Sequence, residues 1–182
     1  APALLRVRLA PDGQFDHGFS YAVAKTDWPP LPVEFVAKAG MLELRSAALT
    51  RRVQLAPCRL SLLDALGRSL LTDADGFGWG EPVDSDRPVT WRQQMSPDAS
   101  FYGLGEKAFP MARRGRRFEL YNTDPGGYEL YDEPINQSIP FFLGLLPVAS
   151  VASGGRTGTA SAAFGLFLDN PALSRHVVHV ER

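Results

Sequence analysis

Residues 60–70, with the sequence LSLLDALGRSL, decide between an all-β fold and a mixed one. They form the only stretch of the chain whose apolar spacing could be taken for a helix. The central residues Asp64-Ala65-Leu66-Gly67-Arg68, however, lie between two short apolar runs and include a glycine, as the turn of a β-hairpin does. We therefore predict two antiparallel strands joined by a turn at 64–68.

Alternation of apolar and polar residues on both sides of this hairpin predicts further strands. Residues 5–9 (LRVRL) and 42–45 (LELR) have the period of two that a strand with one solvated face requires. Further apolar runs occupy Phe19–Ala24, Val89–Met95, Phe118–Asn122, Ile139–Leu145 and Ala162–Leu168. The 17 Gly and 15 Pro residues are spread at short intervals, which disfavours helices. The predicted fold class is all-β, a two-sheet antiparallel β-sandwich of about a dozen strands.

Turn-forming residues separate the predicted strands. Asp75-Gly76, Asp124-Pro125-Gly126-Gly127 and Ser153-Gly154-Gly155 each combine residues that favour reversals or loops. We expect the chain to leave a strand at each of these places.

Length and composition limit the function classes. The 182 residues fit one large domain. Because 19 Lys and Arg face 20 Asp and Glu, for a net charge of -1, the long-range field that would recruit nucleic acid or an anionic membrane is missing. The single cysteine, Cys58, excludes an internal disulfide and is expected to fill the core. The start at Ala1 shows neither a signal peptide nor an initiating Met, so the location stays unknown, with the cytoplasm slightly favoured.

An irregular segment from Ser96 to Tyr131 departs from the strand pattern, and long irregular segments in compact domains are usually functional. The arginine-rich run Arg113–Arg117 is expected to be a positive turn that pairs with nearby acidic residues. Asn122–Tyr128 combines amide, hydroxyl and carboxylate groups with an aromatic ring, the set that binds sugar hydroxyls and sugar C–H faces. Turn capping by the same short side chains is the alternative interpretation.

Motifs in this segment resemble the N-terminal domain of glycoside hydrolase family 31. In order along the chain they are Tyr102-Gly103-Leu104-Gly105-Glu106-Lys107, Arg113-Arg114-Gly115, Asn122-Thr123-Asp124, Gly127-Tyr128 and Ser138-Ile139-Pro140-Phe141-Phe142. The flanking stretches Leu60–Asp73 and Phe164–Asn170 are also similar to the family, so that the resemblance covers about two-thirds of the chain.

The resemblance implies a galactose mutarotase-like sandwich, also called a supersandwich, packed in the parent enzyme on a catalytic (β/α)₈ barrel. Such a barrel needs about 250 residues, so the expectation for residues 1–182 is a single N-terminal sandwich domain without its barrel. The parent enzyme is expected to hydrolyse α-glucosidic or related bonds. The partners implied are the barrel and an oligosaccharide substrate, with no nucleic acid and no membrane.

The resemblance also implies roles for particular residues. Asp124 would accept hydrogen bonds from substrate hydroxyls at the pocket rim, with Thr123 beside it and Tyr128 as a stacking or supporting residue. The structural positions are Gly103, Gly105, Glu106, Arg113 and Arg114, with Glu106 expected to pair with Arg113 or Arg114. Asp132 and Glu133 are expected to be loop or surface charges. No catalytic residue, metal ligand or cofactor is assigned to this chain.

Three alternatives stay open. A freestanding carbohydrate-binding module would present exposed, coplanar aromatic rings, for which Trp28, Trp79 and Trp91 are available; core or inter-domain packing is the usual role of such tryptophans. An aldose mutarotase would need a general acid and base, commonly His with Glu, and no such pair stands out around His17, His176 or His179. A purely structural interaction domain would make no sugar contact.

Overall fold

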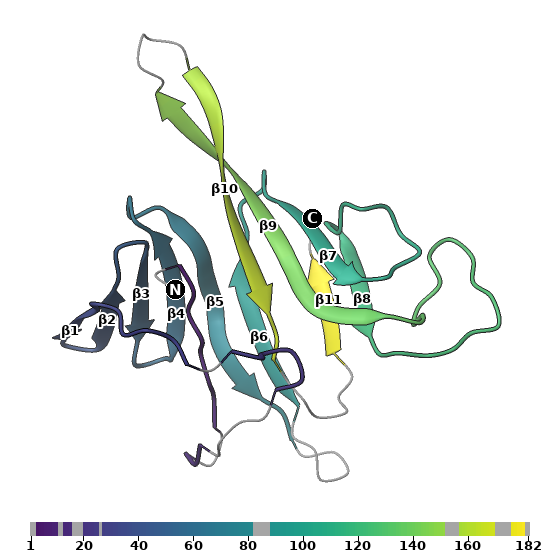
Figure 1. Ribbon diagram of the computed structural model, residues 1–182, viewed down its shortest axis with the longest axis horizontal. Helices are drawn as coiled ribbons and strands as arrows, with labels where there is room; N and C mark the ends of the chain where they lie inside the picture. The colour runs from purple at the N-terminus through teal and green to yellow at the C-terminus, as the bar shows by residue number, and fades with distance from the viewer. Residues whose placement is uncertain are drawn as a thin grey trace. The chain divides into compact units, whose positions relative to one another are not determined.

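A computed structural model describes residues 3–10, 13–15, 20–25, 27–81, 88–151, 157–169 and 176–180. This part of the chain contains eleven strands and no helix, and therefore no helix able to cross a membrane (Figure 1). The chain divides into two compact units, Ala1–Gln14 with Lys25–Met95 and Phe15–Ala24 with Ser96–Arg182. Every strand pairing that is described is antiparallel, which confirms the predicted all-β antiparallel class.

The first unit is one six-stranded sheet in which each strand pairs with the next in sequence (Figure 1). Its strands are β1 (Glu34–Lys38), β2 (Met41–Arg45), β3 (Leu49–Gln54), β4 (Arg59–Asp64), β5 (Ser69–Trp79) and β6 (Val89–Gln94). Where a short turn joins two strands, each strand pairs with its neighbour in sequence, and the turn and the apolar–polar alternation together set the register.

The β4–β5 hairpin confirms the prediction from residues 60–70. The Asp64 carboxylate accepts hydrogen bonds at 2.9 Å from the backbone N–H groups of Leu66 and Arg68, and at 2.6 Å from the Arg68 Nε. Gly67 has a φ of +76°, a conformation that suits glycine. Every contact that closes this turn therefore comes from within five residues.

Two faces of the six-stranded sheet differ in chemistry. Leu44, Arg51 and Leu62 are direct cross-strand partners and share one face, whereas Glu43 and Arg52 pair on the other. Glu43 is buried. It accepts hydrogen bonds from the Arg52 Nε, at 2.8 Å, and from the Arg45 guanidinium, and these two arginines lower the pKa of its carboxyl.

Asp73 joins three strands of the first unit through a buried carboxylate. Its Oδ2 accepts from the Leu60 N–H at 2.7 Å, and its Oδ1 accepts from the Trp91 Nε1 at 2.7 Å and from the Gln93 amide. The Trp91 ring stacks on Phe77 with 5.2 Å between centroids. Trp91 is therefore held by polar and aromatic contacts inside its own sheet.

Several local predictions are wrong. Residues 5–9 and 20–24 are not in strands, because a strand needs a hydrogen-bonded neighbour as well as an alternating pattern. Asp75-Gly76 does not end a strand: β5 continues through it with a register shift, and the positive φ of Gly76 accommodates the bulge. Cys58 is exposed in the turn between β3 and β4, so it does not fill the core.

The second unit contains two ladders, β10-β9-β7 and β11-β8 (Figure 1). Its strands are β7 (Ser100–Gly105), β8 (Arg116–Leu120), β9 (Ser138–Val151), β10 (Thr157–Phe167) and β11 (His176–Val180). The apolar runs predicted over 118–122, 139–145 and 162–168 fall largely within β8, β9 and β10. Ser153-Gly154-Gly155 lies outside the described residues.

A compact apolar core lies in the second unit around Leu104, Phe118 and Leu120, each at most 3% exposed. Phe109 packs edge-on against Phe118 with 5.1 Å between ring centroids, and Phe142 also packs against this cluster. β8 supplies two of the three central side chains, so the core holds the end of β8 in place. The longest described connection between strands, residues 121–137, begins at that end.

Candidate functional site: the 121–137 loop

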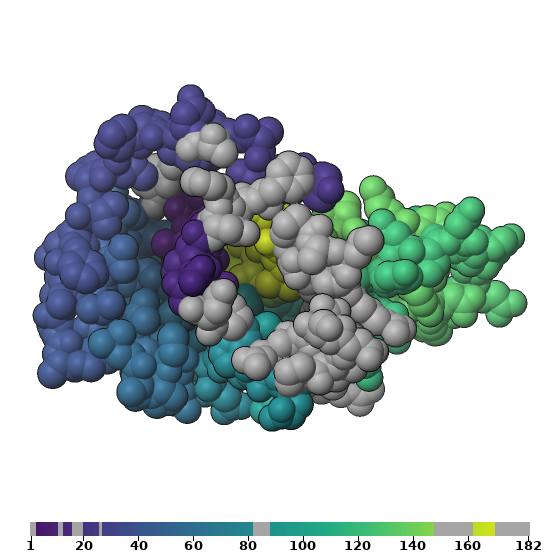
Figure 2. Space-filling view, turned by 90° about the horizontal axis from the view of Figure 1, so that it is seen from below, coloured from purple at the N-terminus to yellow at the C-terminus, as the bar shows by residue number. Residues whose placement is uncertain are grey.

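The segment 121–137 joins β8 to β9 and contains the residues that the resemblance assigns to sugar binding. Its residues 126–132 are exposed, and its green atoms lie at the surface in the space-filling view (Figure 2). A Cβ added to Gly126 or Gly127 would meet nothing within 4 Å, so that part of the loop is open.

Asp124 is exposed near the start of this loop. Within the described part of the chain its carboxylate has neither a hydrogen-bond nor an ion-pair partner. A charged acceptor with no internal partner is available for an external hydrogen-bond donor.

Thr123 has a different part in the structure. Its hydroxyl donates to the Pro134 carbonyl at 2.8 Å, and its backbone N–H donates to the Ile135 carbonyl at 3.4 Å. Ile135 is buried. Both bonds tie the residue directly before Asp124 to the returning limb of the loop. Thr123 therefore closes the base of the loop on which Asp124 stands.

The returning limb is anchored by a buried ion pair that sequence reasoning missed. The Lys107 Nζ lies 2.8 Å from the Glu133 Oε1, and the exposed fractions of the two side chains are 0% and 11%. Glu133 is thus a loop residue, as expected, but its charge is largely buried in an ion pair and does not lie at the surface. No signal in the sequence singles out Lys107 as the partner of Glu133, because the two residues lie 26 positions apart and Glu106 is adjacent to Lys107.

Tyr128 and Glu106 are brought together across the loop. The Tyr128 hydroxyl donates to the Glu106 Oε1 at 3.2 Å, and the Tyr128 side chain is about half exposed. The expected pairing of Glu106 with Arg113 or Arg114 is replaced by this contact. Tyr128 therefore contacts Glu106 within the loop region, and about half of its side chain stays open to solvent.

Arg113 and Arg114 bind backbone carbonyls rather than acidic side chains. Arg113 donates to Gly103 and Pro110 carbonyls at 2.9 Å each, and Arg114 donates to the Ser96 and Ala99 carbonyls. Burial lowers the pKa of Arg113, and the charge of Glu133 opposes that shift. A planar guanidinium with several fixed donors suits the binding of two backbone carbonyls at once.

Arg116, in the same arginine-rich run, contacts two aromatic rings. Its guanidinium lies over the ring of Tyr131 at 4.6 Å and over that of Phe109 at 5.5 Å. Tyr131 has a φ of +81°, and its N–H donates to the Ala108 carbonyl at 2.7 Å. The run therefore fastens irregular backbone and aromatic rings, not a set of surface acids.

Gly103 and Gly105 have φ angles of +110° and +81° at a bulge between β7 and β9. A Cβ at Gly103 would stand 2.7 Å from the Phe141 carbonyl oxygen, and one at Gly105 would stand 2.7 Å from the Gln137 carbonyl oxygen. Leu104 between them also has a positive φ and is fully buried. Both glycines thus admit a close approach of β9 exactly where the loop returns to the sheet.

Other candidate ligands contribute less to this site. Within the described residues no group of three His, Cys, Asp or Glu could hold a metal ion. His17 and the side chains of His176 and His179 lie outside the described part of the chain. Trp28 and Trp79 are partly exposed in the first unit.

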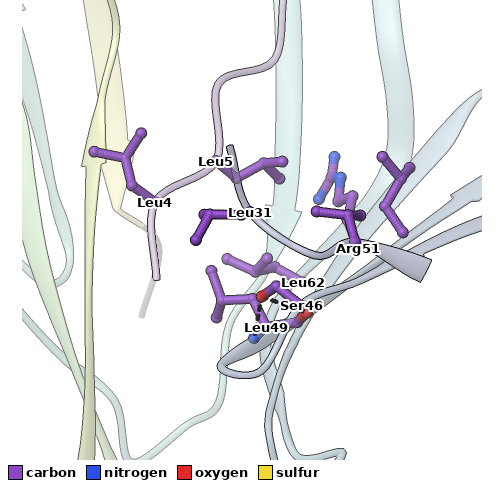
Figure 3. A pocket seen from close by; sticks show the side chains of 9 residues that line it. Leu4, Leu5, Leu31, Ser46, Leu49, Arg51 and Leu62 are labelled. Carbon is purple, nitrogen blue, oxygen red and sulfur yellow. Dashed lines mark hydrogen bonds between the residues drawn. The ribbon is translucent and has the colours of Figure 1, made fainter. Parts of the chain in front are cut away.

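A cavity of about 110 Å³ in the first unit is unsuited to sugar (Figure 3). Its walls are Leu4, Leu5, Leu31, Val33, Leu44, Ser46, Leu49, Arg51 and Leu62. The Ser46 hydroxyl is already hydrogen-bonded to the backbone of Leu49, which leaves Arg51 as the remaining polar group of the lining. A sugar presents many hydroxyls, and each of them needs a hydrogen-bond partner when it is buried.

The antiparallel ladders and the anchored loop define the chain as an all-β protein whose 121–137 loop exposes carboxylates, Asp124 and Glu129 among them. The particular family follows from sequence comparison: the chain belongs to the glycosyl hydrolase 31 N-terminal galactose mutarotase-like domain family, whose model matches residues 1–175. This match confirms both the resemblance and the predicted galactose mutarotase-like sandwich.

Individual relatives agree with the family. An alpha-glucosidase from Saccharolobus solfataricus is 45% identical over 76 residues, or 42% of this chain. Alpha-glucosidase 2 from Bacillus thermoamyloliquefaciens is 27% identical over 172 residues, or 92% of this chain. Among solved structures, a GH31 dextranase from Flavobacterium johnsoniae complexed with isomaltotriose matches 76% of this chain with 28% identity and a TM-score of 0.63.

The chain is much shorter than these proteins. It spans 10% and 19% of the length of the two alpha-glucosidases and 18% of the dextranase. The activities named for the relatives therefore belong to polypeptides several times longer.

Proposed function

We propose that residues 1–182 act as one non-catalytic N-terminal domain of a family 31 α-glycosidase, packing on the catalytic barrel and lending the 121–137 loop to the rim of the substrate pocket. The observation that carries this proposal is Asp124, an exposed carboxylate without an internal partner on a loop whose base is anchored. The substrate class is an α-linked glucosaccharide, as the names of the relatives suggest.

The chemistry of Asp124 suits substrate positioning rather than bond cleavage. A carboxylate accepts two or more hydrogen bonds from neighbouring sugar hydroxyls, and charge-assisted bonds of this kind are the stronger ones. Cleavage with retention needs two carboxyl groups about 5–5.5 Å apart, one as nucleophile and one as acid and base. The proposal places that pair in the barrel and assigns no catalytic residue to this chain.

The test uses the polypeptide in which this domain is joined to its barrel. Hydrolysis of 4-nitrophenyl α-D-glucoside and α-D-xyloside is measured for the unmodified protein, for Asp124→Ala and for Asp124→Asn. We expect Asp124→Ala to lower kcat/KM roughly 10- to 100-fold, since a hydrogen bond to a charged group contributes about 1.5–3 kcal/mol. Asp75→Asn, which changes an exposed carboxylate of the first unit, is the matched control.

Two results would overturn the proposal. Unchanged kcat/KM in Asp124→Ala would remove Asp124 from the substrate site. Turnover by residues 1–182 alone would mean that the chain contains its own catalytic groups.

A freestanding carbohydrate-binding module is the second candidate, favoured by the roughly half-exposed rings of Tyr121, Tyr128 and Tyr131. Tyr131 argues against a stacking platform because Arg116 already covers its ring. Calorimetric titration of residues 1–182 with isomaltose and maltose separates the two candidates. Binding that Tyr128→Ala abolishes would favour the module, and heat changes at the level of buffer dilution would favour the accessory domain.

A further inference from the structure

We infer that the buried Lys107–Glu133 ion pair is a positioning element: it holds the 121–137 loop so that Asp124 lies where it can contact the substrate. This inference rests on the proposed function, because it concerns how the same loop is aimed. A continuous set of contacts runs from Lys107 in the Gly-rich motif to Thr123, the residue directly before Asp124.

The first step fixes the lysine. The Lys107 Nζ forms an ion pair with the Glu133 Oε1 at 2.8 Å, and it donates hydrogen bonds to the Glu119 carbonyl at 2.8 Å and to the Ser138 hydroxyl at 3.3 Å. These three partners come from the loop, from β8 and from β9. The ammonium group therefore stands where the two ends of the loop meet.

The second step fixes the glutamate. The Glu133 Oε2 accepts from the Glu119 N–H at 2.8 Å, so Lys107 and Glu133 bind the carbonyl and the amide of the same residue of β8. One end of β8 is thus held by both members of the ion pair. Because Glu133 has two oxygens and each has its own partner, the carboxylate has little freedom to rotate.

The third step reaches Asp124. Pro134 follows Glu133 directly, and its carbonyl accepts the 2.8 Å hydrogen bond from the Thr123 hydroxyl. Ile135, which is buried, accepts from the Thr123 N–H. Asp124 is the next residue after Thr123, so its backbone position follows the position of Glu133 through two residues.

A buried ion pair is better suited to fixing the position of a loop than to raising the free energy of unfolding. Replacing such a pair with apolar residues is often neutral for folding, because desolvation of the charges offsets their attraction. Its geometry, however, is defined by several short bonds. The Arg92–Asp75 pair has exposed side chains and a single 3.0 Å contact, which gives a matched pair without that constraint.

The test is a double-mutant cycle in the polypeptide that carries both domain and barrel. Glu133→Gln keeps the length of the side chain and removes its charge, while Lys107 keeps its other two acceptors. We expect kcat/KM to fall roughly 5- to 50-fold, since small misplacements of a positioning group are costly in rate. The relative changes in kcat and in KM should match those that Asp124→Ala causes.

The decisive measurement repeats Glu133→Gln in the Asp124→Ala background. If the pair acts through Asp124, the second substitution lowers kcat/KM by less than about twofold there, because the interaction it positions is already gone. An equal loss in both backgrounds, or no loss in either, would overturn the inference. Asp75→Asn should leave kcat/KM unchanged in both.

A second variant covers the case in which Glu133→Gln unfolds. Lys107→Met with Glu133→Gln removes both charges together, and its kcat/KM is compared in the same two backgrounds. Amide hydrogen exchange over residues 121–137 gives a readout that does not depend on activity. We expect faster exchange in both variants, and unchanged exchange would overturn the inference. If Asp124→Ala costs no activity while exchange still increases, the proposed function fails and the anchoring of the loop stands.

Discussion

The turn at 64–68 joins the paired strands β4 and β5, whereas the loop at 121–137 joins β8 and β9, which belong to different ladders, and the two connections are held in opposite ways. The turn is closed by Asp64, Leu66 and Arg68, which lie within five residues of one another. The loop is held by Lys107 and by the backbone of Glu119, which lie 26 and 14 residues from Glu133 (133 − 107 and 133 − 119). A connection that serves only the sheet can be local, whereas one that presents Asp124 depends on the folded core.

The largest effect on stability should come from Gly105→Ala, because its added Cβ meets the backbone at the point where the loop joins β9. A Cβ there lies 2.6 Å from the Ile139 N and requires a φ of +81°, so we expect a loss of roughly 2–4 kcal/mol in the free energy of unfolding. Urea denaturation followed by circular dichroism measures it. Gly126→Ala is the matched control at the open part of the loop, and there we expect a change within about 0.5 kcal/mol. Equal losses in the two variants would contradict the difference between base and tip.

A smaller effect should follow from Thr123→Val, which removes the hydroxyl that closes the loop on Pro134. We expect a loss of about 1 kcal/mol in the free energy of unfolding, the usual contribution of one hydrogen bond. Thr123→Ser keeps the hydroxyl and serves as the control in the same urea titration. A Ser variant as unstable as the Val variant would show that the methyl group, not the hydrogen bond, matters.

The smallest effect should come from Asp64→Asn in the local turn, and it should depend on pH. Burial raises the pKa of Asp64, but hydrogen bonds from Arg68 and Leu66 outweigh it, so that the pKa lies below its ordinary value of 3.8. A carboxyl group with a lowered pKa stabilises the folded state above the unfolded pKa, and this contribution is lost as pH falls through the folded pKa.

The measurement for Asp64→Asn is the urea midpoint at pH 7 and at about pH 3, where protonation has begun to remove the contribution of the carboxylate. The wild-type chain should exceed the variant at pH 7, and the difference should shrink at the lower pH. A difference that is the same at both values would mean that the charge of Asp64 does not stabilise the turn.

Sequence reasoning succeeded where the contacts are local or repeat with a simple period. The alternation in 42–45 and the turn chemistry of 64–68 predict β2 and the β4–β5 hairpin correctly. The same alternation in 5–9 predicts a strand that does not form, because alternation says nothing of a pairing partner. The bulge at Gly76 was taken for a turn, since a glycine with positive φ serves either purpose.

The candidate site was only partly predictable. Asp124 and Tyr128 were assigned from the resemblance, and the structure supplies the exposure of the first and the Glu106 contact of the second. The roles of Thr123 and Glu133 depend on partners that are separated from them in sequence by 11 and 26 residues. Adjacent charges such as Asp132 and Glu133 cannot be sorted by sequence, because burial of one of them is decided by what packs around it.

The sequence by itself therefore determined the all-β class and the family. Those features depend on periodicity, turn chemistry and an ordered set of motifs, all of which are properties of short segments. Only the tertiary structure decided that Lys107 is buried against Glu133 and that Arg113 binds carbonyls instead of acids. The physical reason is that an ion pair or a hydrogen bond is set by distance in space and by desolvation, and both arise only when β7, β8 and β9 have assembled.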